Sequence, residues 1–240
     1  GYPAFSIILN YMLFASFLIF LALPSRSLTG KDKFKVTIQL VITYAIFILS
    51  SLAFLLIFFE AKPFISRTAL SLSEVYENAL PKAGLATLLY PWAGATLNHP
   101  WGADISMIGV YFGFITFPLA LYAVIVKRNA LCIGLFIIAM VNLAAALGPL
   151  TPIRSWFYHL LPYMDMFRNG ALFRFFFIIP MILLAGIGWK TWKNVEGQDK
   201  FLFILVLLCS GLGIALGAMA FSKEISLLTD FKFSLKIFYE

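Results

Sequence analysis

The sequence predicts an all-α integral membrane protein with six transmembrane helices. The first observation is composition: 62% of the 240 residues are hydrophobic and 12% are charged, whereas soluble domains contain about 45–50% apolar and about 25% charged residues. The second is a mean hydropathy of +0.93, and the third is a series of long apolar runs. These values exclude a water-soluble globule and a disordered chain, and two widely separated cysteines exclude a disulfide scaffold.

The predicted transmembrane helices are set by length, because a helix needs about 20 apolar residues to cross a hydrocarbon core of about 30 Å. Six stretches qualify, and Arg174 is the only charged residue within them: 4–23, 36–59, 105–126, 130–147, 171–189 and 201–221. We expect one multi-pass domain over 1–240, as an internal piece of a longer protein. The stretch 222–240 would lie along the outer interface or begin an outer segment.

The orientation follows from basic residues in the three short connections 24–35, 127–129 and 191–200. They include Arg26, Lys31, Lys33, Lys35, Lys127 and Arg128. Because basic residues in short loops favour the cytoplasm, these connections are predicted to be cytoplasmic. Both ends of the chain and the long connections 60–104 and 148–170 then face outward. The net charge of +7 indicates basic residues that set the topology or contact lipid headgroups, and no nucleic acid is expected as a partner.

The first long connection is predicted to form two short helices lying on the membrane surface. Ser71 followed by Glu74 is a capping-box pattern that opens a helix through Leu80, and Pro81 ends it. A second short apolar face follows at Leu85, Leu88 and Leu89.

The second long connection contains the strongest candidate site. Asn169 is a predicted N-cap for the helix that follows, with Arg168 just before it and Arg174 about one turn inside. Free backbone amides, a positive helix dipole and two guanidinium groups suit a phosphate. The alternative is that both arginines extend to lipid phosphates as ordinary helix-end residues.

For each of the other candidate residues, a structural role is an alternative to a functional role. Arg67 and Arg154 are further outer basic residues that could bind phosphate or simply occupy loops. Glu74 could act as an acid or base, or simply be solvated. Asp104 could act in the same way, or its carboxylate could interact favourably with the helix dipole at the start of the third predicted helix. Asp165 is the expected ion-pair partner of Arg168. No metal-ligand or phosphate-loop motif occurs in the sequence, so no metal site or cofactor is predicted here.

Several of these segments resemble the YfhO family of bacterial membrane proteins, over residues 1–189. That family has a Leu-Gly-x-x-Thr-Pro turn, a Leu-Pro, and a Phe-Arg-x-Pro-x-Arg-Phe segment before an apolar helix ending in Ala-Gly-x-Gly. The similar residues here are Leu147-Gly148-Pro149-Leu150-Thr151-Pro152, Leu161-Pro162, Phe167-Arg168, Arg174-Phe175 and Ala185-Gly186-Ile187-Gly188. The upstream segments 62–67, 80–81 and 88–91 are also similar.

The resemblance implies a GT-C type glycosyltransferase in the bacterial cytoplasmic membrane. Such enzymes transfer sugar from a polyprenyl-phosphate donor to an outer cell-envelope polymer. A carboxylate base activates the acceptor hydroxyl and the polyprenyl phosphate leaves, so that cations beside the leaving group lower the barrier. Arg168 and Arg174 would supply those cations. The resemblance places the catalytic carboxylate, and any divalent metal, in a first outer loop preceding Gly1.

Two interpretations from other classes stay open. A transporter or flippase for a lipid-linked saccharide would share the outer phosphate site, but should carry polar residues at mid-membrane depth. Asn142 is the clearest such residue in this sequence. A non-catalytic membrane subunit would use its outer connections only to bind a partner.

Overall fold

A computed structural model describes residues 3–22, 30–61, 70–91, 107–194 and 200–215 of the chain. Within these ranges the chain is helical and has no strand, as the sequence predicts. The longer helices are α1 (Pro3–Ala22), α2 (Gly30–Ala61), α5 (Ala130–Ala146), α7 (Phe173–Lys193) and a last helix, Lys200–Ala215. The short ones are α3 (Leu72–Val75), η2 (Lys82–Leu88), α4 (Thr116–Tyr122), the π-helical turn η5 (Ala123–Lys127), η6 (Gly148–Leu150), α6 (Ile153–Leu160), η7 (Met164–Met166) and η8 (Gly170–Leu172).

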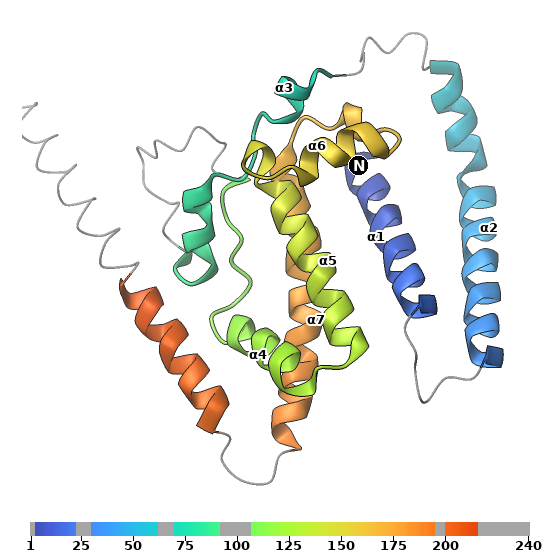
Figure 1. Cartoon of the computed structure of the whole chain (residues 1–240). Helices are drawn as coiled ribbons and strands as arrows, with labels where there is room; N and C mark the ends of the chain where they lie inside the picture. Colours follow the sequence, from blue (N-terminus) through green and yellow to red (C-terminus); the bar gives the residue numbers. More distant parts are fainter. Residues whose placement is uncertain (1–2, 23–29, 62–69, 92–106, 195–199, 216–240) are drawn as a thin grey trace, which may run out of the picture.

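The centre of the molecule is formed by α5 and α7, which pack along each other, with α4 against the second half of α7 (Figure 1). Gly188 of α7 permits that contact, because a Cβ atom there would collide with the Leu119 carbonyl oxygen of α4. Further out, α1 packs on α5, where Asn142 Nδ2 lies 2.9 Å from Met12 Sδ of α1. Asn142 therefore has a partner on another helix.

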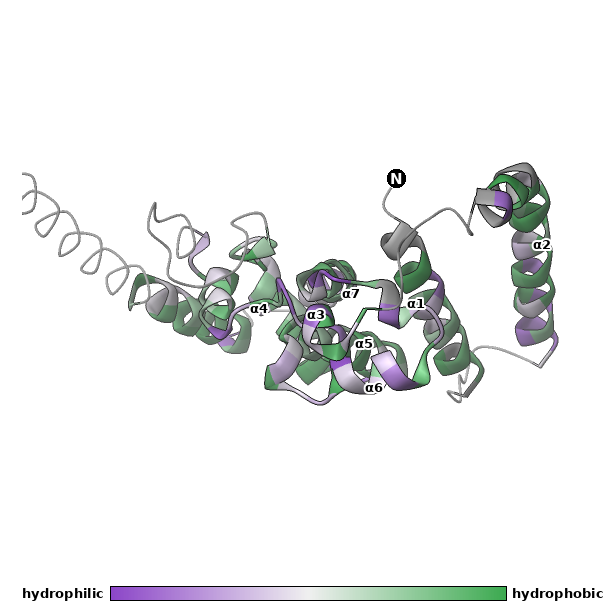
Figure 2. Cartoon of the chain, turned by 90° about the horizontal axis from the view of Figure 1, so that it is seen from above, coloured by the Kyte–Doolittle hydropathy of each residue, from purple (hydrophilic) through white to green (hydrophobic). Residues whose placement is uncertain are grey.

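Two described helical stretches are long and apolar enough to cross a membrane, Gly30–Ser50 and Gly170–Lys193. The second is largely buried against its neighbours. The first shows no burial inside the molecule, and its side chains stay exposed along its length, including Val41, Ile46 and Leu49. Figure 2 shows α2 standing apart from α5 and α7, with apolar colour on most of its turns. The other apolar helices in the described ranges are shorter.

Most of the predicted spans coincide with helices. Stretches 4–23, 130–147 and 171–189 match α1, α5 and α7, and 201–221 matches the last helix up to Ala215, beyond which the chain lies outside the described residues. The helix over the second predicted stretch, α2, begins earlier than predicted, at Gly30. Its first turns therefore include lysines, and Lys33 Nζ donates to the carbonyl of Leu21 in the last turn of α1 (2.8 Å).

The prediction of one continuous helix over 105–126 is wrong. Residues 109–113 are not helical, and the helical part is confined to Thr116–Lys127. Gly113 has φ of +114°, a conformation that helices do not contain and that side chains rarely adopt. Pro118 lies in the first turn of α4, where its missing N–H has no helical partner to lose.

Candidate functional site

The site lies at the end of the bundle where α5 ends and α7 begins, and where α6 runs across them (Figure 1). Here the residues from both predicted outer connections meet. Hydrogen bonds join the first connection to the second and to the helix ends beside it: Leu70 N–H to Asp165 O (3.0 Å), Tyr158 O–H to Leu70 O (2.9 Å), Ala171 N–H to Asn78 O (3.1 Å) and Leu80 N–H to Ala146 O (2.8 Å). The segment 70–81 is therefore held in place by residues far along the sequence.

Local sequence explains the course of this segment. Ser71 and Glu74 form the predicted capping box, with the Ser71 N–H donating to Glu74 Oε2 at 2.7 Å. The helix that they open is shorter than predicted and ends at Val75, not near Leu80. Asn78 turns the chain with a left-handed φ of 52°, and its side chain donates to Asn169 Oδ1 at 3.2 Å.

The facing turn has a glycine for a steric reason. Gly148 has φ of +58°, and a Cβ atom there would lie 2.5 Å from the Cβ of Ala79. A larger residue would therefore push the two connections apart at this point. The Leu-Gly-x-x-Thr-Pro segment of the sequence is thus one of the parts of the second connection that contact the first.

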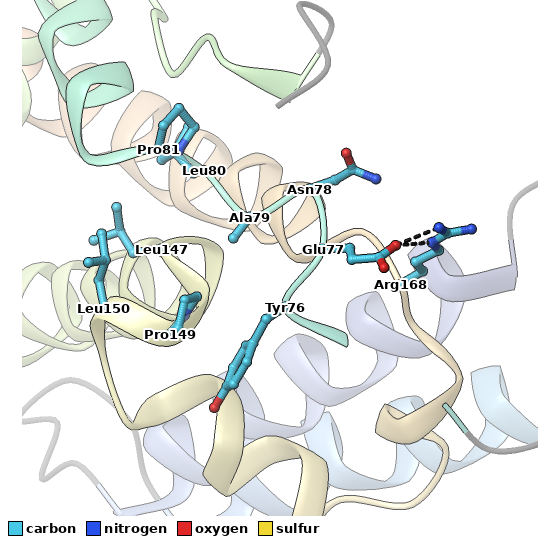
Figure 3. A pocket seen from close by; sticks show the side chains of 10 residues that line it. All are labelled: Tyr76, Glu77, Asn78, Ala79, Leu80, Pro81, Leu147, Pro149, Leu150 and Arg168. Carbon is cyan, nitrogen blue, oxygen red and sulfur yellow. Dashed lines mark hydrogen bonds and ion pairs between the residues drawn. The ribbon is translucent and has the colours of Figure 1, made fainter. Parts of the chain in front are cut away.

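Between the connections lies a cavity of about 510 Å³. Its lining residues are Tyr76, Glu77, Asn78, Ala79, Leu80, Pro81, Leu147, Pro149, Leu150 and Arg168. Figure 3 shows Leu147, Pro149 and Leu150 on one side of the turn and an ion pair between Glu77 and Arg168 on the other. The cavity therefore has an apolar wall and a charged edge.

The ion pair joins Arg168 Nε and Nη2 to a single oxygen, Glu77 Oε2, at 2.6 and 2.5 Å. Both side chains are accessible, with exposed fractions of 62% for Arg168 and 45% for Glu77. Exposed pairs of this kind contribute about 0–1 kcal/mol to stability. An anion arriving at the cavity can therefore compete with Glu77 for the guanidinium at modest cost.

Arg154 lies inside the molecule, with no exposed surface. Its Nη2 donates to the carbonyls of Phe167 (2.8 Å) and Met164 (3.3 Å), and its Cζ stands 5.2 Å from the centre of the Phe173 ring. Burial lowers the pKa of Arg154 to about 10, so that the guanidinium stays charged at neutral pH. The prediction that Arg154 binds phosphate or occupies an open loop does not fit this position; its contacts are internal.

Arg174 is the second residue of α7 and is also buried, with 7% of its surface exposed. Its Cζ lies 4.9 Å from the centre of the Phe175 ring. Arg174 does not line the cavity that contains Arg168. Of the two arginines predicted to act together, the structure places Arg168 at the cavity edge and Arg174 in the protein interior.

Two further expectations about this end of α7 are corrected. The side chain of Asn169 does not cap a helix; it accepts from Asn78, and the turn η8 separates it from α7. Asp165, expected to pair with Arg168, instead accepts through its backbone carbonyl from Leu70. The residue that pairs with Arg168 is Glu77, on the other connection.

The remaining candidates have different outcomes. Arg67 and Asp104 lie outside the described residues. Glu74 is occupied by its capping box: hydrogen bonds from the Ser71 hydroxyl and backbone N–H lower the pKa of its carboxyl below the ordinary range. Within the described ranges, no group of three His, Cys, Asp or Glu side chains could hold a metal ion.

Comparison with protein-family models, with curated proteins and with solved structures found no match to this chain.

Proposed function

We propose that the chain belongs to a multi-pass membrane protein in which six apolar stretches cross the bilayer. The support comes first from α2, in which no residue of the apolar stretch Gly30–Ser50 is buried inside the molecule. The hydroxyls of Thr37, Thr43 and Ser50 each donate to a carbonyl four residues back in the same helix (2.8–2.9 Å). An apolar helix whose hydroxyls are satisfied internally suits a lipid environment.

The third crossing in this proposal is a broken one. Non-helical backbone is tolerated at membrane depth where the protein buries it. Ile108 and Val110 are buried while Gly109 and Tyr111 are exposed, and the Val110 N–H donates to the Thr87 hydroxyl at 2.9 Å. The helical remainder, Thr116–Lys127, packs against α7. This arrangement reconciles an apolar stretch of spanning length with the interruption seen in its first half.

We further propose that the protein is a GT-C type glycosyltransferase of the bacterial cytoplasmic membrane. It would transfer sugar from a polyprenyl-phosphate donor to a cell-envelope polymer on the outer face, as the resemblance to the YfhO family suggests. The observation that carries the proposal is the cavity between the two connections, with the exposed Arg168 at its edge. A guanidinium there can hold the phosphate and stabilise its growing charge as the sugar leaves.

The transporter alternative receives less support. Asn142, its candidate for a polar residue on a path, has no exposed surface and uses Nδ2 to contact Met12 and the Ile138 carbonyl. These contacts favour a role in helix packing.

The test uses the full-length protein in membranes, supplied with radiolabelled polyprenyl-phosphate sugar. Arg168→Ala should lower transfer into polymer by at least about tenfold, the effect of losing one charge-assisted contact. Lys82→Ala serves as the matched control, because Lys82 is an exposed basic residue of the same connection that does not line the cavity. Normal membrane insertion with unchanged transfer in Arg168→Ala would exclude Arg168 from the site.

A further inference from the structure

Arg154 and Arg168 are linked through one peptide group. The Phe167 carbonyl that accepts from Arg154 Nη2 at 2.8 Å is bonded to the backbone nitrogen of Arg168. The same Nη2 donates to the Met164 carbonyl, so that one guanidinium holds both ends of the turn leading to Arg168. The Arg154 guanidinium also packs over the Phe173 ring.

The cost of burying Arg154 points to a specific role. A buried charge without a partner charge is expensive, so that its hydrogen bonds must offset the loss of water. Among the described residues no carboxylate forms an ion pair with Arg154, and its Nε has no hydrogen-bond partner. The hydrogen bonds that the guanidinium does make are to the turn 164–167.

We infer that Arg154 is a positioning residue that presents Arg168 at the edge of the cavity. This inference rests on the proposed function, in which Arg168 binds the anionic group. Arg154 does not touch the ligand; it fixes the direction in which the backbone leaves Phe167. The planar guanidinium holds two carbonyls from one nitrogen and packs on an aromatic ring, which the ammonium of a lysine reproduces poorly.

The first experiment measures position without any ligand. In the full-length protein with its other cysteines replaced, Glu77→Cys and Arg168→Cys are joined by a short bifunctional thiol reagent. Arg154→Lys should lower the cross-linking yield by about tenfold, the population shift from losing one charge-assisted hydrogen bond. Arg154→Gln, which removes the charge but keeps a donor, is the second variant should Arg154→Lys fail to fold.

The control is Thr151→Val, which removes the hydrogen bond from Thr151 Oγ1 to the Ala144 carbonyl (2.6 Å) before α6 without touching residues 164–168. It should leave the yield unchanged. An unchanged yield in the Arg154 variants would overturn the inference. Equal losses in Thr151→Val and Arg154→Lys would also overturn it, because they would indicate a general structural effect.

A second measurement separates this inference from the proposed function. Binding of inorganic phosphate to the same protein, without the cysteine substitutions, should weaken in Arg154→Lys and be lost in Arg168→Gln. Absence of phosphate binding in the unmodified protein would count against the proposed function, while the cross-linking yields would still decide whether Arg154 positions residue 168.

Discussion

Arg168 and Glu77 are the residues on which the candidate site depends, and their pairing lies on the surface. Because both side chains are exposed, the pair is worth little to stability. The pair matters for its electrostatics, because Glu77 binds the same Arg168 guanidinium that we propose to bind the phosphate. Removing either partner should therefore change binding much more than folding.

The first prediction concerns Glu77→Gln. Removing the competing carboxylate should tighten phosphate binding about threefold to tenfold, while changing the free energy of unfolding by less than about 1 kcal/mol. Binding can be followed by calorimetry and unfolding by heating in detergent, with Lys82→Ala as control. Weaker binding in Glu77→Gln would indicate that Glu77 contacts the ligand favourably.

The second prediction concerns pH. The pKa of Glu74 is lowered from its ordinary value of 4.5 by the Ser71 hydrogen bonds. The ionised carboxylate therefore stabilises the folded capping box above pH about 4.5, and this stabilisation is lost as pH falls through the lower, folded-state pKa. Hydrogen exchange of the Ser71 amide should accelerate, relative to Glu74→Gln, on acidification. An identical pH profile in Glu74→Gln would contradict this role.

The sequence predicted some residues of the site and missed others. Arg168 could be singled out from the sequence because a basic residue beside a helix start is unusual on a predicted outer side. Its partner was not: Glu77 lies 91 positions away along the chain, and Asp165 was nearer in sequence. Arg154 could not be recognised as buried, because an arginine in a predicted loop is ordinarily exposed.

At the scale of elements, the packing of α4 on α7 depends on one glycine. The third prediction is that Gly188→Ala lowers the free energy of unfolding by about 1–3 kcal/mol, because its Cβ would meet the Leu119 carbonyl. A Cβ atom at Gly186, two residues earlier on α7, would meet no atom of another element within 4 Å. Gly186→Ala should therefore be neutral or stabilising by about 0.5–1 kcal/mol. Thermal unfolding in detergent compares the two, and equal destabilisation would contradict the packing.

Helices were predictable from the sequence where a long apolar run determines them. Helices α1, α5 and α7 follow the predicted spans, since an uninterrupted apolar run has few alternatives to a helix. The prediction for 105–126 failed because Gly109 and Gly113 lie within it, and the left-handed φ at Gly113 is incompatible with a helix. Helix α6 was missed because buried and exposed positions both mix residue types: Arg154 is buried, while Trp156 and Leu160 are exposed.

At the scale of the whole molecule, the two ends of the bundle differ in charge. Figure 1 shows α1 and α7 ending, and α2 and α5 beginning, at the end opposite to α6. Lysines and arginines of the described residues collect there: Lys31, Lys33, Lys35, Lys127, Arg128, Lys190, Lys193 and Lys200. This distribution fits the predicted cytoplasmic side. The proposed function requires Arg168 to face the opposite side of the membrane.

Cysteine labelling in intact cells tests that requirement most directly. Arg168→Cys and Lys31→Cys, each placed alone in a cysteine-free full-length protein, are treated with a membrane-impermeant maleimide before and after permeabilisation. We predict that the cysteine at position 168 reacts in intact cells and that the one at position 31 reacts only after permeabilisation. Labelling of position 168 only after permeabilisation would contradict an outward-facing site.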